Sequence, residues 1–210
     1  MVAGGTDDLY YMIPGREGDV DSFVRSCLDR GSVFVDVGAN IGYYTLVASK
    51  LIGSSGRVYA IEPIPQTITI LKANVKINEC FNVIVHEKAA WSSRDKLTLK
   101  IPGKWYGLVS AFRNGVNIIV DATTLDELLQ AEDQIDCIKI DVEGAELRVL
   151  QGAKKVLKRT RYIILKLSRD IKEILRELQG SGFKCEKARF STYIICRQNR
   201  FSVKNYFNEL

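Results

Sequence analysis

Short apolar runs alternate with amphipathic stretches along most of this chain. Val, Ile and other β-branched or aromatic residues predominate in the runs, which is typical of strands buried on both faces of a parallel sheet. Between the runs, apolar residues recur at helical spacing behind capping residues or prolines. The predicted strands are 33–37, 57–62, 83–85, 137–141, 162–167, 183–187 and 192–196.

This alternation of strands and helices predicts a doubly wound α/β fold with a parallel sheet between two helical layers. The chain has 210 residues, and we interpret 1–210 as a single domain. Residues 1–30 are predicted to form a terminal arm and a helix, and 96–120 a hairpin-like insertion. The long loop of this insertion, 102–114, is predicted to be a substrate lid because loops of this size often carry function, and simple packing of the hairpin on the sheet is the equal alternative.

The few cysteines and the single histidine narrow the possible chemistry. The five cysteines are scattered and never spaced as CxxC, which argues against a disulfide framework and a structural zinc site. We expect most of them to be small core residues. A single histidine, His86, makes metal sites built on imidazole and Ser–His or Cys–His catalysis improbable on count alone. No metal is predicted.

Charge and hydropathy bear on partners and location. The net charge is +5, and basic residues become more frequent in the C-terminal third. Solvated helix faces account for this pattern, and binding of RNA or an anionic substrate is the alternative. No apolar run approaches the roughly 18 residues of a membrane span. The acidic start does not resemble a signal or transit peptide, so we expect a cytoplasmic protein.

The stretch VDVGANIGYYT carries the first candidate site. A predicted strand breaks at Gly38, turns at Asn40 and passes Gly42 into a helix, which leaves free N–H groups where α/β sheets bind nucleotide-like ligands. Asp36 and the missing second glycine of the dinucleotide fingerprint disfavour NAD. Glu62 ends the next strand, where an acid can accept hydrogen bonds from both ribose hydroxyls.

The stretch KIDVEGAE carries the second candidate site. Asp141 ends a predicted strand at the edge where doubly wound sheets bind ligands, and Glu143 follows it before a turn. Lys139 lies in the same buried strand, and a buried lysine needs a carboxylate partner. Stabilisation of a helix N-terminus is the alternative role for Glu143 and Glu146.

VDVGANIGYYT, AIEP and KIDVEGAELRVLQGA together resemble the FkbM family of S-adenosylmethionine-dependent methyltransferases. The resemblance spans roughly residues 33–167. It implies the class I methyltransferase fold, a mostly parallel seven-stranded sheet with the last strand antiparallel, and S-adenosylmethionine as the cofactor.

The same resemblance assigns roles to residues. Lys139, Asp141 and Glu143 become the candidate catalytic residues. Lys166 and Ser168 stand where family members commonly carry Glu and His, which leaves Lys139 without one expected partner if the two strands are neighbours. The implied cofactor contacts are Asp36, Gly38, Asn40 and Gly42 on the methionine part, Glu62 on the ribose, Glu87, Lys88 and Ala89 near the adenine, and Asp141 beside the reactive methyl group.

We therefore predict O-methylation of a hydroxyl on a sugar, glycan or secondary metabolite, with Asp141 orienting the hydroxyl or accepting its proton. An RNA or protein methyltransferase that uses the basic C-terminal third is one alternative. A catalytically silent cofactor-binding module is another. The apolar tail at 201–210 covers either its own sheet or a neighbouring chain, so an oligomer stays open.

Overall fold

The computed structural model describes residues 18–101, 116–189 and 192–201. The expected N-terminal arm, the predicted lid and nearly all of the apolar tail lie outside these ranges. None of the helices within them combines the length and apolar character that a membrane crossing requires.

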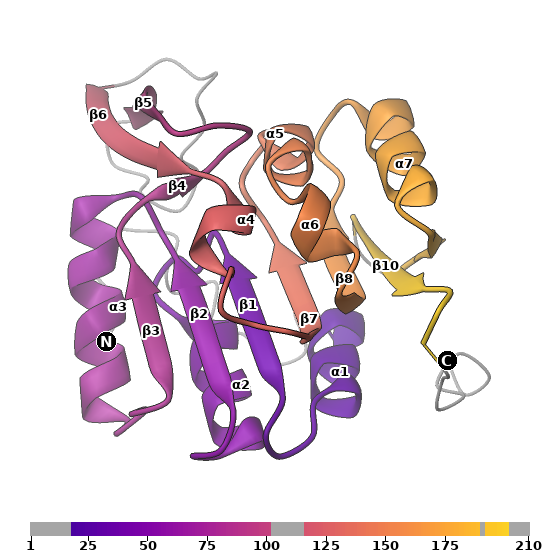
Figure 1. The fold of residues 1–210 in the computed structure, drawn as a ribbon. Coiled ribbons are helices and arrows are strands. Elements are labelled where there is room, and N and C mark those ends of the chain that lie inside the picture. The colour runs from indigo at the N-terminus through magenta and orange to yellow at the C-terminus, as the bar shows by residue number, and fades with distance from the viewer. Residues whose placement is uncertain (1–17, 102–115, 190–191, 202–210) are drawn as a thin grey trace.

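A seven-stranded sheet forms the centre of the molecule, in the order β3-β2-β1-β7-β8-β10-β9 (Figure 1). Neighbours from β3 to β8 pair in parallel, and β10 is antiparallel to both β8 and β9. This confirms the predicted sheet with its last strand antiparallel. The strands are β1 Val33–Val37, β2 Arg57–Ile61, β3 Val83–His86, β7 Ile135–Ile140, β8 Thr160–Lys166, β9 Phe183–Lys187 and β10 Tyr193–Gln198.

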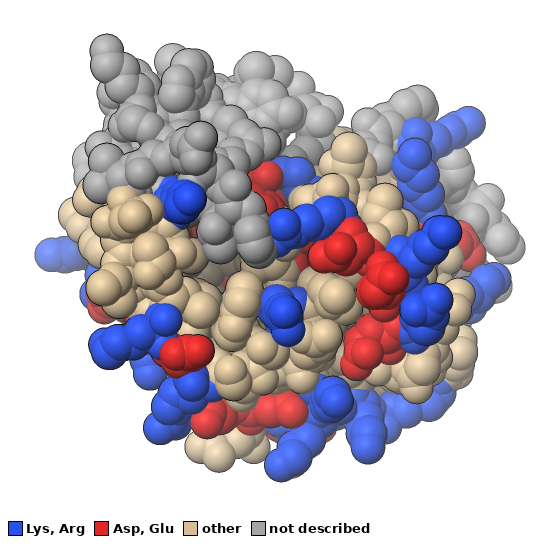
Figure 2. Space-filling model, turned by 90° about the horizontal axis from the view of Figure 1, so that it is seen from above, with Lys and Arg blue, Asp and Glu red and all other residues tan. Residues whose placement is uncertain are grey.

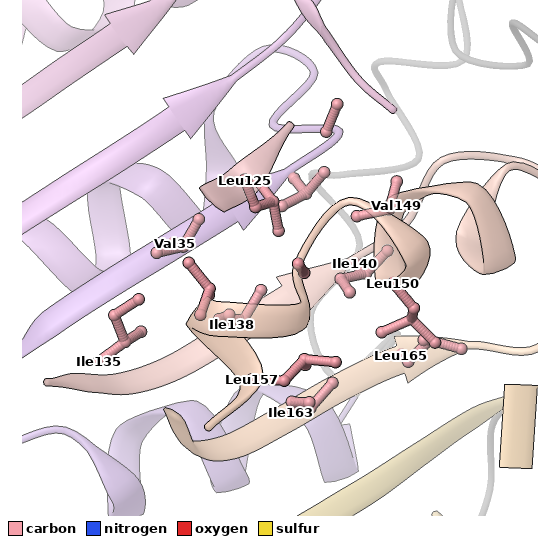
Figure 3. Packing of buried hydrophobic residues seen from close by; sticks show 14 of the residues in the cluster. Val35, Leu125, Ile135, Ile138, Ile140, Val149, Leu150, Leu157, Ile163 and Leu165 are labelled. Atoms are coloured by element: carbon pink, nitrogen blue, oxygen red, sulfur yellow. The ribbon is translucent and has the colours of Figure 1, made fainter. Parts of the chain in front are cut away.

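Helices cover both faces of the sheet. Because side chains alternate along a strand, Phe34 packs with α1 and α2, whereas Val35 packs with α4 to α6 (Figure 3). The first face is covered by α1 Gly18–Cys27, α2 Tyr43–Ile52 and α3 Pro65–Ile77. The second is covered by α4 Leu125–Leu128, α5 Glu146–Gln151, α6 Lys154–Leu157 and α7 Ile171–Gly180.

A second, three-stranded sheet lies beyond the carboxyl end of β3 (Figure 1). Its strands are β4 Ala89–Ala90, β5 Asp95–Ile101 and β6 Val116–Thr123. The antiparallel pairing of β5 with β6 agrees with the predicted hairpin. The parallel pairing of β4 with β6 was not predicted, because a strand of two residues has no readable pattern. Leu99 and Val120 of this sheet pack against Ile64, which precedes α3.

The cysteines partly correct the prediction. Cys27, Cys80 and Cys137 are buried and free, as expected of small core residues. Cys185 and Cys196 instead form a disulfide between β9 and β10. The antiparallel register places these two residues directly opposite each other, and spacing alone does not reveal such a register.

Ile138→Ala tests the core between the sheet and its second helical layer. Ile138 is fully buried on the central strand β7 (Figure 3), so we expect the free energy of unfolding to fall by about 2–5 kcal/mol in urea denaturation. Ile119→Ala is the matched control, because Ile119 is 72% exposed and should change stability by less than about 0.5 kcal/mol. Equal small losses in both variants would contradict the packing described here.

Candidate active site

The loop between β1 and α2 has a backbone that side chains rarely permit. Gly38, Asn40 and Gly42 have φ values of 79°, 50° and 98°. A Cβ atom on Gly38 would lie 2.0 Å from the carbonyl oxygen of Asp141, so the ends of β1 and β7 touch here through backbone alone. The Gly38 N–H also donates to the carbonyl of Ile61, 3.0 Å away. The ends of three neighbouring strands therefore converge at this loop.

Glu62, directly after β2, is held in one orientation. Its Oε2 accepts the N–H of Asn40 and its Oε1 accepts the N–H of Ile64, both at 3.0 Å. Each carboxylate oxygen keeps a further lone pair. Burial raises the pKa of Glu62 to about 7, against the opposing effect of the two backbone hydrogen bonds. Glu62 is thus a positioned acceptor whose charge changes near neutral pH.

Asp36 lies beneath this loop. Its side chain is 1% exposed, and its Oδ2 accepts the Thr45 hydroxyl of α2 at 2.7 Å. Its Oδ1 lies 3.9 Å from Lys139 Nζ. Burial raises the pKa of Asp36, although the positive charge of Lys139 opposes this effect. Asp36 therefore ties β1 to α2 and to the neighbouring strand.

Lys139 joins the two candidate sites. Asp36 and Lys139 are register partners on β1 and β7. The Lys139 ammonium is also 3.8 Å from Asp141 Oδ2 and lies 4.8 Å from the ring centroid of Tyr44. The prediction that this buried lysine has a carboxylate partner is confirmed, and it has two.

Asp141 is the most heavily contacted carboxylate of the site. Its Oδ2 accepts the Tyr193 hydroxyl at 2.6 Å, and its Oδ1 lies 3.2 Å from Lys166 Nζ. Burial acts to raise the pKa of Asp141, but the charges of Lys139 and Lys166, together with hydrogen bonds from Tyr193 and Lys166, outweigh burial and hold the pKa below its ordinary value. Asp141 is consequently an anion at neutral pH with both oxygens engaged.

Lys166 and Ser168, the two departures from the family pattern, contact carboxylates next to Asp141. Lys166 Nζ is 2.7 Å from Glu143 Oε1 as well as close to Asp141. The Ser168 hydroxyl donates to Glu146 Oε1 at 3.0 Å. That oxygen also accepts the N–H of Gly144, which supports the alternative reading of Glu146 at the start of α5. Neither departure leaves Lys139 unpaired.

A pocket opens at the carboxyl ends of the strands. The predicted site residues that line it are Gly38, Asn40, Glu62, Ala89, Asp141 and Glu143. The other lining residues come from the ends of β1 and β2, the start of α3, the small sheet and the approach to α5, namely Val37, Ile61, Pro63, Ile64, Thr67, Ala90, Trp91, Leu97, Leu99, Val142 and Ala145. The pocket is therefore polar toward β1 and β7 and largely apolar toward the small sheet.

The remaining predicted residues do not line this pocket. Asp36, Lys139 and Gly42 lie behind the lining residues, where they support the loop and Asp141. Glu87 and Lys88 are exposed outside the pocket. Among the residues that the structure describes, no group of three His, Cys, Asp or Glu side chains is placed to hold a metal ion.

The sequence did not predict the contact of Tyr193 with Asp141, nor the side of the pocket that Leu97, Leu99 and Trp91 form. Tyr193 reaches Asp141 from 52 residues away, on a strand with no recognisable motif. The alternation of Leu97 and Leu99 predicted a strand, but it did not show that this strand contributes to the pocket. Trp91 could have been suspected only from its position shortly after a strand end.

Two curated relatives are each 25% identical to this chain over the aligned residues. A hexuronic acid methyltransferase of Haloferax volcanii is 25% identical over 189 residues, which cover 87% of this chain and 77% of the relative. A probable cobalt-precorrin-6B C(15)-methyltransferase (decarboxylating) of Sulfurisphaera tokodaii is 25% identical over 135 residues, covering 59% of this chain and 70% of the relative.

A methyltransferase FkbM from Methylobacillus flagellatus KT has a similar fold, with a TM-score of 0.58 and 18% sequence identity. The alignment covers 90% of this chain, and the chain spans about half (47%) of that structure. The sequence model of the protein family described as the methyltransferase FkbM domain matches residues 36–185 of this chain. The chain therefore belongs to the FkbM methyltransferase family.

Proposed function

We propose that this protein binds S-adenosylmethionine in the described pocket and methylates a hydroxyl oxygen of a sugar or another small molecule. The observation that carries the proposal is the convergence of the Gly38 loop, Glu62 and Asp141 on one pocket. These three features come from the ends of β1, β2 and β7, where a doubly wound sheet binds its ligands.

The lining residues fit the chemical parts of this cofactor. Glu62 is fixed by backbone N–H groups and can still accept hydrogen bonds from ribose hydroxyls. The apolar side chains of Ile64 and Leu99 suit a purine ring. The carboxylate of Asp141 favours a sulfonium cation nearby. When bound, the cofactor supplies the methyl group, whose carbon–sulfur bond breaks as the new oxygen–carbon bond forms.

The acceptor side needs one group to orient the hydroxyl and one to take its proton. Asp141 suits the role of orienting the hydroxyl. One of its oxygens accepts a hydrogen bond from Tyr193, the other forms an ion pair with Lys166, and its lowered pKa makes it a weak base. Glu143 lines the pocket and is the better candidate for the proton. Lys139 balances the negative charge behind them.

A sugar acceptor has two lines of support. The relative from Haloferax volcanii, which is named for hexuronic acid, aligns over most of this chain. Figure 2 looks onto the edge where the parallel strands end, and its coloured surface shows acidic and basic side chains interspersed. A continuous basic surface, which RNA binding favours, is not seen on that part of the described residues.

The function is tested by incubating the protein with radiolabelled S-adenosylmethionine and separate pools of glycans, small hydroxylated metabolites, RNA and protein. Label should enter the glycan or metabolite pool and remain there under conditions that hydrolyse esters, as an ether does. Asp141→Asn should lower this transfer at least about tenfold. Label in RNA or protein alone would contradict the proposed acceptor, and cofactor binding without any transfer would favour a catalytically silent module.

Binding of S-adenosylhomocysteine should weaken as the pH falls through 7. Glu62, with a pKa of about 7, is ionised above this pH and protonated below it. Ribose hydroxyls donate to the ionised form, so calorimetric affinity should fall by up to about tenfold for each pH unit below 7 and level off above it. The slope should disappear in Glu62→Gln, whose affinity should be lower than that of the wild type at and above pH 7 and similar to it at low pH.

The matched control is Glu173→Gln, which neutralises an exposed glutamate on α7. It should keep both the wild-type affinity and the wild-type pH dependence. If Glu62→Gln shows the same pH slope as the wild type, another group titrates and Glu62 does not hold the ribose.

Gly38→Ala should damage both the loop and cofactor binding. The new Cβ atom would meet the Asp141 carbonyl in a backbone with positive φ, a strain of about 1–3 kcal/mol or more in the free energy of unfolding. Displacing the loop should also weaken S-adenosylhomocysteine binding by roughly tenfold or more. Thermal denaturation and calorimetry measure the two effects.

Gly180→Ala is the matched control for this substitution. Gly180 ends α7, and a Cβ atom there would meet no other atom within 4 Å. Its replacement should therefore keep cofactor affinity and preserve or slightly raise stability. Unchanged affinity in Gly38→Ala would contradict the placement of the cofactor at this loop.

A further inference from the structure

We propose that Tyr193 is a positioning residue for methyl transfer, which holds the Asp141 carboxylate in the orientation that the acceptor needs. This inference rests on the proposed function. It assigns a role to the C-terminal strand β10, which no motif of the sequence connects with the site.

The sheet topology brings Tyr193 to Asp141. β10 runs antiparallel to β8, and its register places Tyr193 directly opposite Lys166. Asp141 follows β7, on the other side of β8. The Tyr193 hydroxyl reaches Asp141 Oδ2 at 2.6 Å, and Lys166 Nζ lies 3.2 Å from Asp141 Oδ1. Two cross-strand partners thus hold one oxygen each.

Tyr193 is a neutral hydrogen-bond donor to Asp141, which the lysines are not. A hydroxyl donor stabilises the Asp141 anion without adding a positive charge, whereas each lysine brings an ammonium group that repels a sulfonium cation. The tyrosine side chain is also rigid and 2% exposed, so its hydrogen bond is protected from water. Tyr193 therefore fixes the direction of the Asp141 lone pairs at little electrostatic cost to the cofactor.

The ionisation of Asp141 depends on several neighbours besides Tyr193. Because these neighbours remain in a Tyr193 variant, loss of the hydroxyl should shift the titration of Asp141 and not abolish its charge at neutral pH. The charged or titratable groups around it are Asp36 on β1, Lys139 on β7, Lys166 on β8, Glu143 in the following loop and Glu146 on α5.

Tyr193→Phe is the direct test, because it removes one oxygen and keeps the ring. With a methyl acceptor identified by the labelling experiment, kcat should fall by about tenfold to a hundredfold, as expected for a lost hydrogen bond to a charged group. The KM for S-adenosylmethionine should stay within about twofold, since Tyr193 does not line the pocket.

A second measurement needs no substrate. The carboxyl carbon of Asp141, followed by NMR in protein labelled with ¹³C-aspartate and assigned with Asp141→Asn, reports its titration directly. The midpoint should be higher in Tyr193→Phe than in the wild type, because the hydrogen bond favours the ionised form. In an Asp141→Asn background, Tyr193→Phe should lower kcat by no more than about twofold, which shows that the tyrosine acts through the aspartate.

Tyr59→Phe is the matched control. The Tyr59 hydroxyl also donates to a buried carboxylate, Glu132, at 2.5 Å, but Glu132 precedes β7 at the opposite end of the sheet from the pocket. This variant loses a comparable hydrogen bond and should keep the wild-type kcat and the wild-type Asp141 titration.

The outcomes separate this inference from the proposed function. A wild-type kcat and a wild-type Asp141 titration in Tyr193→Phe would overturn the positioning role even when methyl transfer is established. If the wild type transfers no methyl group, the proposed function fails, and an unshifted Asp141 titration would then independently refute the control of Asp141 by Tyr193.

Discussion

The buried ammonium group of Lys139 is the constraint on which the site depends. A lysine that is 4% exposed is tolerated only when carboxylates and aromatic faces replace its water. Asp36 on β1 and Asp141 after β7 provide the charges, and Tyr44 on α2 provides the ring. Because removing either partner of a buried ion pair is costly, these groups favour one alignment of the two central strands.

That alignment also builds the side of the pocket where we propose that the cofactor binds. With β1 and β7 in register, Gly38 meets the Asp141 carbonyl, and only a residue without a side chain fits between them. The loop then presents the Asn40 N–H to Glu62, which closes the contact with β2. The charge pairing inside the sheet and the hydrogen bonds at its edge are thus parts of one arrangement. A change in the charge pairing or in these hydrogen bonds therefore alters the pocket.

The sequence predicts this side well because its signals are local. An apolar run followed by Gly38, Asn40 and Gly42 predicts where the strand ends, where the chain turns and where the helix begins. The demand of Lys139 for a carboxylate likewise follows from a single residue in a buried run. Glu87 and Lys88 are exposed and Ala89 lines the pocket, a difference between neighbouring residues that position in the sequence does not reveal.

The side of the pocket that we propose for the acceptor is assembled from segments far apart in the sequence, which is why less of it was predicted. Lys166 meets Asp141 because β8 pairs in parallel with β7, and Tyr193 meets it because β10 returns antiparallel beside β8. The disulfide between β9 and β10 depends on register in the same way. Register is a property of paired strands and not of either strand alone. The local stretches therefore predict the loop after β1 and Glu62, whereas the surroundings of Asp141 follow from how β8 and β10 are placed beside β7.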